Sequence, residues 1–176
     1  TTQPVAILTG GASGSGKSTL LKQYVPNIQD YVIIDIDKMR EYLPEYKGWN
    51  ANSTQEEVKD VYNKLFDTLG NPCRYNIIVD GTMNKAKSYK PILDKLRKLG
   101  YKVLIMYVKV TKEQSIQRAM SRYQKTGRYV PKFVIDEIFM NGTAAFDELK
   151  ENSDGYILID NSGAKPVVES QTTDTL

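Results

Sequence analysis

The sequence contains no histidine among its 176 residues. This absence excludes Ser-His-Asp and Cys-His catalytic arrangements, zinc sites built on histidine, and proton transfer through imidazole. A general base in this protein must therefore be a carboxylate or, less often, a lysine. Cys73 is the single cysteine, so an internal disulfide is excluded and a reducing compartment is the simplest setting.

Long apolar runs are also missing. No stretch approaches the roughly 18 apolar residues that a membrane-spanning helix needs, and the first residues lack the charged-then-apolar order of a signal peptide. We therefore expect a cytoplasmic protein without membrane contact. The net charge of +3 is small for a dedicated nucleic acid binder. A composition of 40% hydrophobic and 26% charged residues indicates a globular domain with a buried core.

Short apolar runs rich in β-branched and aromatic residues recur along the chain. They are continuous rather than alternating, which is typical of strands that are buried on both faces of a parallel sheet. Most of them end in a small or an acidic residue. Five runs predict strands, at residues 5–10, 31–37, 75–81, 101–110 and 156–160.

Helical patterns with recognisable ends separate these predicted strands. Residues 53–70 carry one apolar stripe and end in glycine, and a Thr111–Gln114 capping box opens a pattern that stops at Gly127. Strands that alternate with helices of this length predict βαβ units and a three-layer αβα domain with a parallel sheet of about five strands. We expect this domain to cover residues 1–162, followed by a polar C-terminal tail at 163–176.

The segment TGGASGSGKST, residues 9–19, satisfies the pattern G-x-x-x-x-G-K-S. A predicted strand leads into it and a helical pattern leaves it, whereas a flexible Gly/Ser linker would need neither these flanks nor the lysine. Glycines let backbone amides turn inward around an anion, and the helix adds the positive end of its dipole. We expect Lys17 to reach the β and γ phosphates and the Ser18 hydroxyl to ligate Mg²⁺. The predicted nucleotide-binding residues of the loop are Gly11, Ala12, Ser13, Gly14, Ser15, Gly16, Lys17, Ser18 and Thr19.

Two aspartates, Asp35 and Asp37, lie at the end of the second predicted strand. The carboxyl edge of a parallel sheet faces the ligand crevice, and both side chains share one side if the strand continues that far. A carboxylate there can accept the proton of an attacking substrate hydroxyl. We take Asp37 as the candidate base and Asp35 as a candidate substrate contact. The alternative for both is a helix N-cap or a loop anchor.

Asp80 ends the third predicted strand and Thr82 follows on the same rim. Asp80 can hold Mg²⁺ through water or contact the substrate, and Thr82 can contact the substrate too. The alternative is a turn aspartate that precedes a glycine.

Basic residues are concentrated between positions 114 and 135, where no acidic residue occurs. Arg118, Arg122 and Lys125 share a helix face, and Arg128 follows just beyond the predicted helix end. Arginines on a movable segment can stabilise the charge that phosphoryl transfer spreads over the equatorial oxygens. Arg122 and Arg128 are therefore candidate catalytic residues and Arg118 a candidate nucleotide contact, with a solvated basic face as the alternative.

With these residues assembled, the chain resembles the zeta-toxin family of small P-loop kinases. The matching segments are GASGSGKST, VIIDIDKMREYLPEY, NIIVDGT, SRYQKTGRYVP and YILIDNSG. The resemblance implies an adenylate-kinase-like P-loop fold that uses ATP and Mg²⁺. It also implies roles for individual residues: Lys17 and Ser18 on phosphates and metal, Asp37 as base, Asp80 and Thr82 on substrate or metal, and Arg122 and Arg128 on the γ-phosphate.

Members of that family phosphorylate a sugar hydroxyl of UDP-N-acetylglucosamine and are restrained by an antitoxin. The resemblance therefore implies a nucleotide-sugar kinase for which an antitoxin is a candidate partner. The chain also resembles phage-type 5′-polynucleotide kinases, in which Arg40 would hold a substrate phosphate and the basic runs would contact a nucleic acid backbone. A switch or motor that only hydrolyses nucleotide is less favoured, because the sequence has no Asn-Lys-x-Asp run to read guanine.

Overall fold

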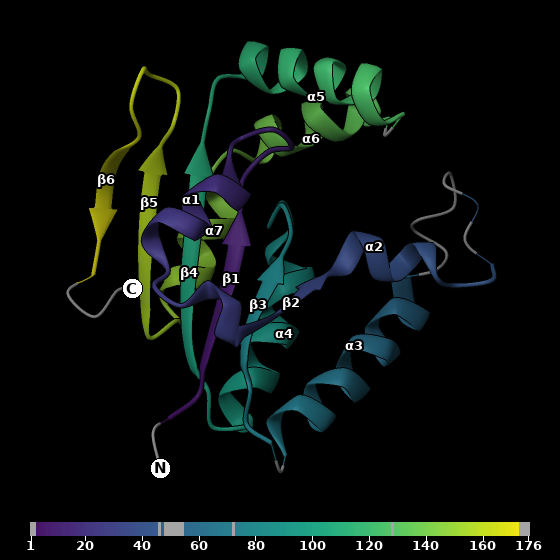
Figure 1. Ribbon diagram of the computed structural model, residues 1–176, viewed down its shortest axis with the longest axis vertical. Coiled ribbons are helices and arrows are strands. Elements are labelled where there is room, and N and C mark those ends of the chain that lie inside the picture. The colour runs from purple at the N-terminus through teal and green to yellow at the C-terminus, as the bar shows by residue number, and fades with distance from the viewer. Residues whose placement is uncertain (1–2, 46, 48–54, 72, 128, 173–176) are drawn as a thin grey trace.

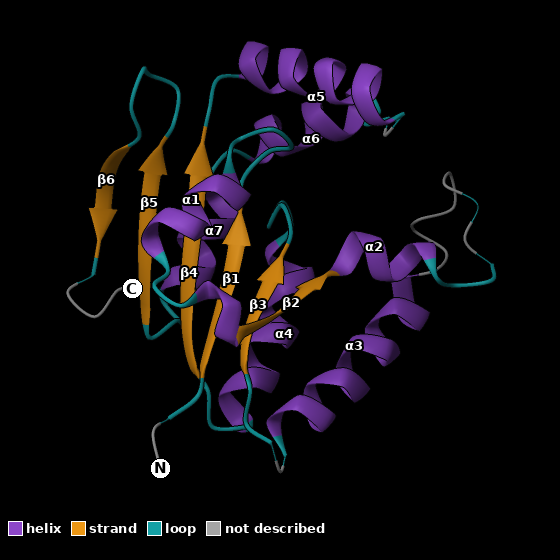
Figure 2. Cartoon of the chain, in the orientation of Figure 1, coloured by secondary structure: helices purple, strands orange, loops and turns teal. Residues whose placement is uncertain are grey.

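The computed structural model describes residues 3–45, 47, 55–71, 73–127 and 129–172 (Figure 1). Within these ranges the side chains of residues 37, 40, 41 and 55 are not described. The strands form one central sheet and the helices lie outside it (Figure 2). Among the described residues, no helix combines the length and apolarity that crossing a membrane requires.

Six strands make up the sheet, in the order β2-β3-β1-β4-β5-β6. The first five are parallel, and β6 pairs antiparallel with β5. The inner strands are continuous apolar segments and are almost fully buried, as a sheet covered on both faces requires. The strands span Val5–Gly10 (β1), Tyr31–Asp35 (β2), Asn76–Asp80 (β3), Lys102–Lys109 (β4), Gly155–Asp160 (β5) and Val167–Gln171 (β6).

Helices cover both faces of the sheet and complete three layers. One apolar cluster joins the sheet to α3, α4 and α7, and a second joins it to α1. The three-layer fold expected from the sequence is therefore present. The helices span Lys17–Tyr24 (α1), Ile36–Glu41 (α2), Gln55–Gly70 (α3), Ala86–Lys98 (α4), Lys112–Thr126 (α5), Lys132–Asn141 (α6) and Ala144–Lys150 (α7), with a 3-10 turn at Ile28–Asp30.

The sixth strand corrects two expectations from the sequence. The sheet has six strands rather than about five, and β6 lies within residues 163–176, which we expected to be a polar tail. An edge strand pairs with one neighbour only, and its faces need not be covered by helices. Its residues can therefore be polar. Val168 packs against the apolar cluster that contains α1, whereas Val167 is exposed.

The ends of α5 agree with the sequence analysis. The Thr111 hydroxyl accepts a hydrogen bond from the Gln114 backbone amide, and Gln114 Oε1 accepts one from the Thr111 backbone amide, which completes the capping box. Gly127 ends α5 with φ of 72°, a left-handed conformation that favours glycine. Pro131 is the N-cap of α6. In Figure 1 both helices lie beyond the carboxyl ends of β1 and β4.

Candidate functional site

The loop between β1 and α1 has the shape of an anion cradle. Gly11, Gly14 and Gly16 have φ values of 122°, 76° and 93°. Residues with a Cβ rarely adopt such positive φ values. Close packing adds a second requirement for glycine. A Cβ on Gly14 would lie 2.7 Å from the Cβ of Arg118, and one on Gly16 would lie 2.6 Å from Asn161 Nδ2. The glycines thus set both the curvature of the loop and its contacts with neighbouring elements.

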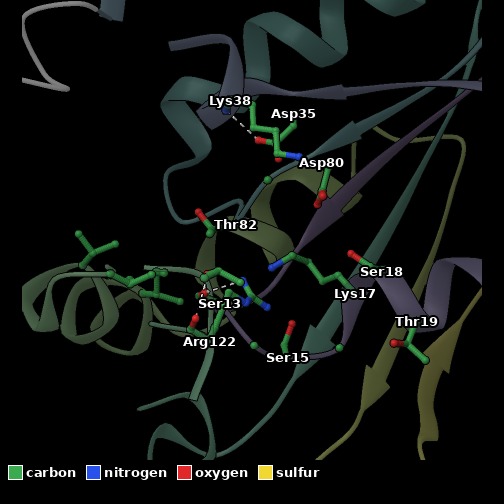
Figure 3. A pocket seen from close by; sticks show the side chains of 17 residues that line it. Ser13, Ser15, Lys17, Ser18, Thr19, Asp35, Lys38, Asp80, Thr82 and Arg122 are labelled. Carbon is green, nitrogen blue, oxygen red and sulfur yellow. Dashed lines mark hydrogen bonds between the residues drawn. The ribbon is translucent and has the colours of Figure 1, made fainter. Parts of the chain in front are cut away.

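Lys17 lies across this loop from the first turn of α1. Its Nζ donates hydrogen bonds to the carbonyls of Gly11 at 2.7 Å and Ala12 at 3.1 Å. Ser15 is 1% exposed, and within the described residues its Oγ is buried without a hydrogen-bond partner. Figure 3 shows this hydroxyl pointing from the loop toward the side of the pocket where Lys17 and Arg122 lie. A buried polar atom of this kind needs a partner, and a bound phosphate oxygen would supply one.

Two carboxylates lie side by side at the carboxyl edge of the sheet, beyond the loop (Figure 3). Asp35 and Asp80 are register partners at the ends of β2 and β3. Thr9, fully buried on β1, donates its hydroxyl to Asp80 Oδ1 at 2.9 Å and accepts from the Gly81 amide at 3.1 Å. One buried hydroxyl thus fixes the side chain of Asp80 and the turn that follows it.

The end of β2 differs from the expectation. The strand stops at Asp35, so Asp37 is the second residue of α2 and strand alternation does not relate the two aspartates. Asp35 Oδ1 accepts a hydrogen bond from the Lys38 amide at 3.1 Å, which is the geometry of an N-cap. Asp35 therefore takes the N-cap role that the sequence left open, and it also lines the pocket.

The C-terminal part of α5 and the start of α6 form the remaining wall. Arg122 Nη1 approaches Ser13 Oγ at 3.5 Å, so this guanidinium lies beside the phosphate loop (Figure 3). Thr126, Val130, Val134 and Ile138 continue the wall. Together with the loop and the strand ends they enclose a cavity of about 580 Å³.

The cavity brings together most, but not all, of the site residues expected from the sequence. Arg118 donates to the Gly14 carbonyl at 2.8 Å and is not among the lining residues, so in this structure it supports the loop. Arg128 lies outside the described residues, as do the side chains of Asp37 and Arg40. The expected site residues that do line the cavity are Ser13, Gly14, Ser15, Gly16, Lys17, Ser18, Thr19, Asp35, Asp80, Thr82 and Arg122.

Comparison with known proteins agrees with this geometry. The model of the zeta toxin family matches residues 1–172, nearly the whole chain. The chain belongs to the zeta toxin family. It is 32% identical over 133 residues to Toxin PezT of Streptococcus pneumoniae, a match that covers 70% of this chain and 51% of PezT. This zeta toxin chain therefore spans about half the length of the curated relative it matches.

Solved structures share the fold of this family member. A structure of the PezAT chromosomal toxin-antitoxin system of Streptococcus pneumoniae has a TM-score of 0.74 at 22% identity, covering 100% of this chain and 75% of that chain. The AvrRxo1-ORF1:-ORF2 structure with ATP has a TM-score of 0.72 at 14% identity, covering 96% of this chain and 58% of that chain. At these identities the likeness establishes the fold alone, a three-layer α/β domain with a mostly parallel sheet.

Several residues around this cavity were not found by sequence reasoning. Thr9 carried one signal, a polar residue inside an apolar strand. Lys38 and the apolar residues of α6 carried none, because helical patterns do not tell which face meets a ligand. Asn161 lies in the family-matching segment YILIDNSG, but that match did not single it out: it follows β5, and its Nδ2 donates to the Ser15 carbonyl at 2.9 Å.

The turn that holds Asn161 is itself fixed by hydrogen bonds. Asp160 Oδ1 accepts from the Ser162 hydroxyl at 2.6 Å and from the Ser162 amide at 2.9 Å. These two bonds hold the pKa of Asp160 below its usual value. Both bonds favour the charged carboxylate and hold the turn beside the phosphate loop.

Proposed function

We propose that this protein is an ATP-dependent kinase that transfers the γ-phosphoryl group of ATP to a hydroxyl of a small-molecule substrate. The observation that carries the proposal is the convergence of three groups on one cavity: the phosphate loop, Arg122, and the register-paired Asp35 and Asp80. A phosphate holder, a cation and carboxylates are the parts that phosphoryl transfer to an alcohol requires.

Catalysis would depend mostly on positioning and charge. The loop amides and Lys17 would bind the phosphates. Lys17 already lies across the loop in which the phosphates would be held. Arg122 would stabilise the charge that develops on the transferred group. Asp37, which family resemblance makes the base, would accept the proton of the substrate hydroxyl. Asp35 caps the helix that carries Asp37, which supports its orientation.

The residues present also fit Mg²⁺. A bound Mg²⁺ would supply positive charge that offsets the charge of the phosphates. Ser18 and Asp80 line the cavity and would supply oxygen ligands. The described residues contain no group of three or more acidic or cysteine side chains able to hold a metal. Water and phosphate oxygens would therefore complete the shell, as Mg²⁺ prefers.

For the acceptor we propose a nucleotide sugar such as UDP-N-acetylglucosamine. Membership of the zeta toxin family supports this choice. The cavity continues past the loop to Asp35 and Lys38, which leaves room for an acceptor beyond the γ-phosphate. Lys38 would offer a positive charge to an acceptor diphosphate.

We also propose that an antitoxin restrains the enzyme. Support comes from the related PezAT structure, which is that of a toxin-antitoxin system. The net charge of only +3 argues against a dedicated nucleic acid binder.

Substitution of the loop lysine tests the proposed activity. Lys17→Met removes the ammonium that would contact the phosphates, and we expect the rate of phosphate transfer to fall about a hundredfold or more. Lys22→Met is the matched control, because Lys22 is exposed on the same helix and does not line the cavity. The measurement is transfer of label from γ-labelled ATP. Equal activity of the wild type and Lys17→Met would refute the proposed role of the loop.

A further inference from the structure

Side chains from outside the phosphate loop hold three of its successive carbonyls. Each donor comes from a segment distant in sequence, either α5 or the turn after β5. The three hydrogen bonds run from Ser115 Oγ to the Ser13 carbonyl at 2.9 Å, from Arg118 Nη1 to the Gly14 carbonyl at 2.8 Å, and from Asn161 Nδ2 to the Ser15 carbonyl at 2.9 Å.

The burial of two of these donors, Ser115 and Asn161, favours a specific role. Ser115 is fully buried on α5, whose other buried residue is Ala119. An apolar side chain could pack at this position, so the hydroxyl is there for its hydrogen bond rather than for packing. Asn161 is half-buried against Gly16, and its backbone N–H donates to the Lys109 carbonyl at 2.8 Å. Arg118 packs its Cβ against Gly14. Ser115 and Asn161 are therefore held by packing where they meet the loop, whereas Arg118 is exposed and meets it through its Cβ and its guanidinium.

These bonds determine where the loop amides point. A peptide unit is planar and trans, so its carbonyl and the next amide point in opposite directions. Fixing the carbonyls of Ser13 and Ser15 outward therefore directs the amides of Gly14 and Gly16 to the other side. Without such bonds, a glycine-rich loop would sample many backbone states, because glycine has wide conformational freedom.

We propose that Ser115, Arg118 and Asn161 are positioning residues that hold the phosphate loop in its anion-binding form before nucleotide arrives. This inference rests on the proposed nucleotide-binding function and adds a set of supporting residues to it. When the loop is already in its binding form, nucleotide binding does not have to include the free energy of reaching that form. Its apparent dissociation constant rises in inverse proportion to the binding-competent fraction when the support is removed.

Affinity for nucleotide is the first test. Ser115→Ala and Asn161→Ala each remove one donor, and we expect about five- to tenfold weaker binding of a non-hydrolysable ATP analogue by calorimetry. Ser115→Thr keeps the hydroxyl and is expected to bind like the wild type. Ser121→Ala, exposed on the same helix, is the matched control and should change nothing. Wild-type affinity in both Ser115→Ala and Asn161→Ala would overturn the proposal.

Arg118 needs a separate comparison, because an arginine near the loop could also bind phosphate directly. Arg118→Met keeps an aliphatic chain against Gly14 and removes the donor. A positioning residue predicts the same loss of affinity for ADP as for the ATP analogue. A selective loss for the ATP analogue would mean direct contact with the γ-phosphate and would overturn the positioning role of Arg118.

Amide hydrogen exchange without any ligand distinguishes this inference from the proposed function. The peptide containing residues 13–17 should exchange severalfold faster in Ser115→Ala than in the wild type or Ser121→Ala. Unchanged exchange would overturn the inference even if the wild type binds ATP. If Ser115→Ala exchanges faster but the wild type binds no nucleotide, the proposed function is refuted while the role of Ser115 in the loop is supported.

Discussion

At the scale of single residues, the site depends on a polar group buried in its floor. Thr9 is fully buried and connects β1 to Asp80 and Gly81 through two hydrogen bonds. Valine has nearly the same shape as threonine but no hydroxyl, so the substitution would leave a carboxylate oxygen and an amide without their partner. Thr9 is therefore a position where shape alone is not enough.

Thr9→Val is expected to lower both stability and activity. Loss of the two hydrogen bonds should decrease the free energy of unfolding by roughly 1–3 kcal/mol, and release of Asp80 should slow phosphate transfer. Urea denaturation and transfer of label from ATP measure the two effects. Thr9→Ser, which keeps the hydroxyl, is the control. A valine variant with wild-type stability and rate would show that Asp80 needs no support from Thr9.

The sequence reveals residues whose role follows from local spacing, and misses those whose role depends on distant partners. The loop residues from Gly11 to Lys17 were predictable because one short motif contains them. Thr9 and Asp80 are 71 residues apart, Ser13 and Ser115 are 102 apart, and Ser15 and Asn161 are 146 apart. Folding brings these pairs together, and no local pattern records them.

At the scale of elements, strand and helix ends decide what reaches the cavity. The sequence predicted buried strands well, because residues in the middle of a covered sheet must be apolar. It placed the end of β2 two residues too late, because Ile36 continues the apolar run while Asp35 already caps a helix. It also missed β6, because an edge strand carries no strong apolar signal.

The contact between α5 and α6 makes the wall of the cavity sensitive to acid. Lys112 Nζ lies 2.7 Å from Asp136 Oδ1, and this ion pair, with the charge of Lys132, holds the pKa of Asp136 below its usual value of 3.8. Because the folded pKa is the lower one, this contribution to stability is present above the usual pKa. It is lost as the pH falls through the folded value.

The free energy of unfolding should therefore fall more steeply below about pH 4 in the wild type than in Asp136→Asn, whose amide does not titrate. Urea denaturation at a series of pH values measures both curves. Above that pH the two curves should run parallel. Parallel curves throughout the acid range would show that the ion pair between α5 and α6 contributes nothing to stability.

At the scale of the whole molecule, the order of the sheet explains why the site lies where it does. β1 is central, β3 and β4 flank it, and the connections that follow β1, β2 and β3 meet at one edge. Parallel strands end at the same edge, so the loop, Asp35 and Asp80 converge there. The sequence predicted this convergence correctly. It could not predict how α5 and α6 close the cavity, because that depends on packing between distant segments.

The most direct test of the central claim follows the γ-phosphate of ATP. Purified protein is incubated with γ-labelled ATP and Mg²⁺, together with UDP-N-acetylglucosamine, a 5′-hydroxyl oligonucleotide, or buffer alone, and Lys17→Met is run in parallel. The account predicts label on the nucleotide sugar with the wild type and none with Lys17→Met. Label on the oligonucleotide would contradict the proposed acceptor. Release of free phosphate at one rate, whatever acceptor is added, would contradict the proposal that the protein is a kinase.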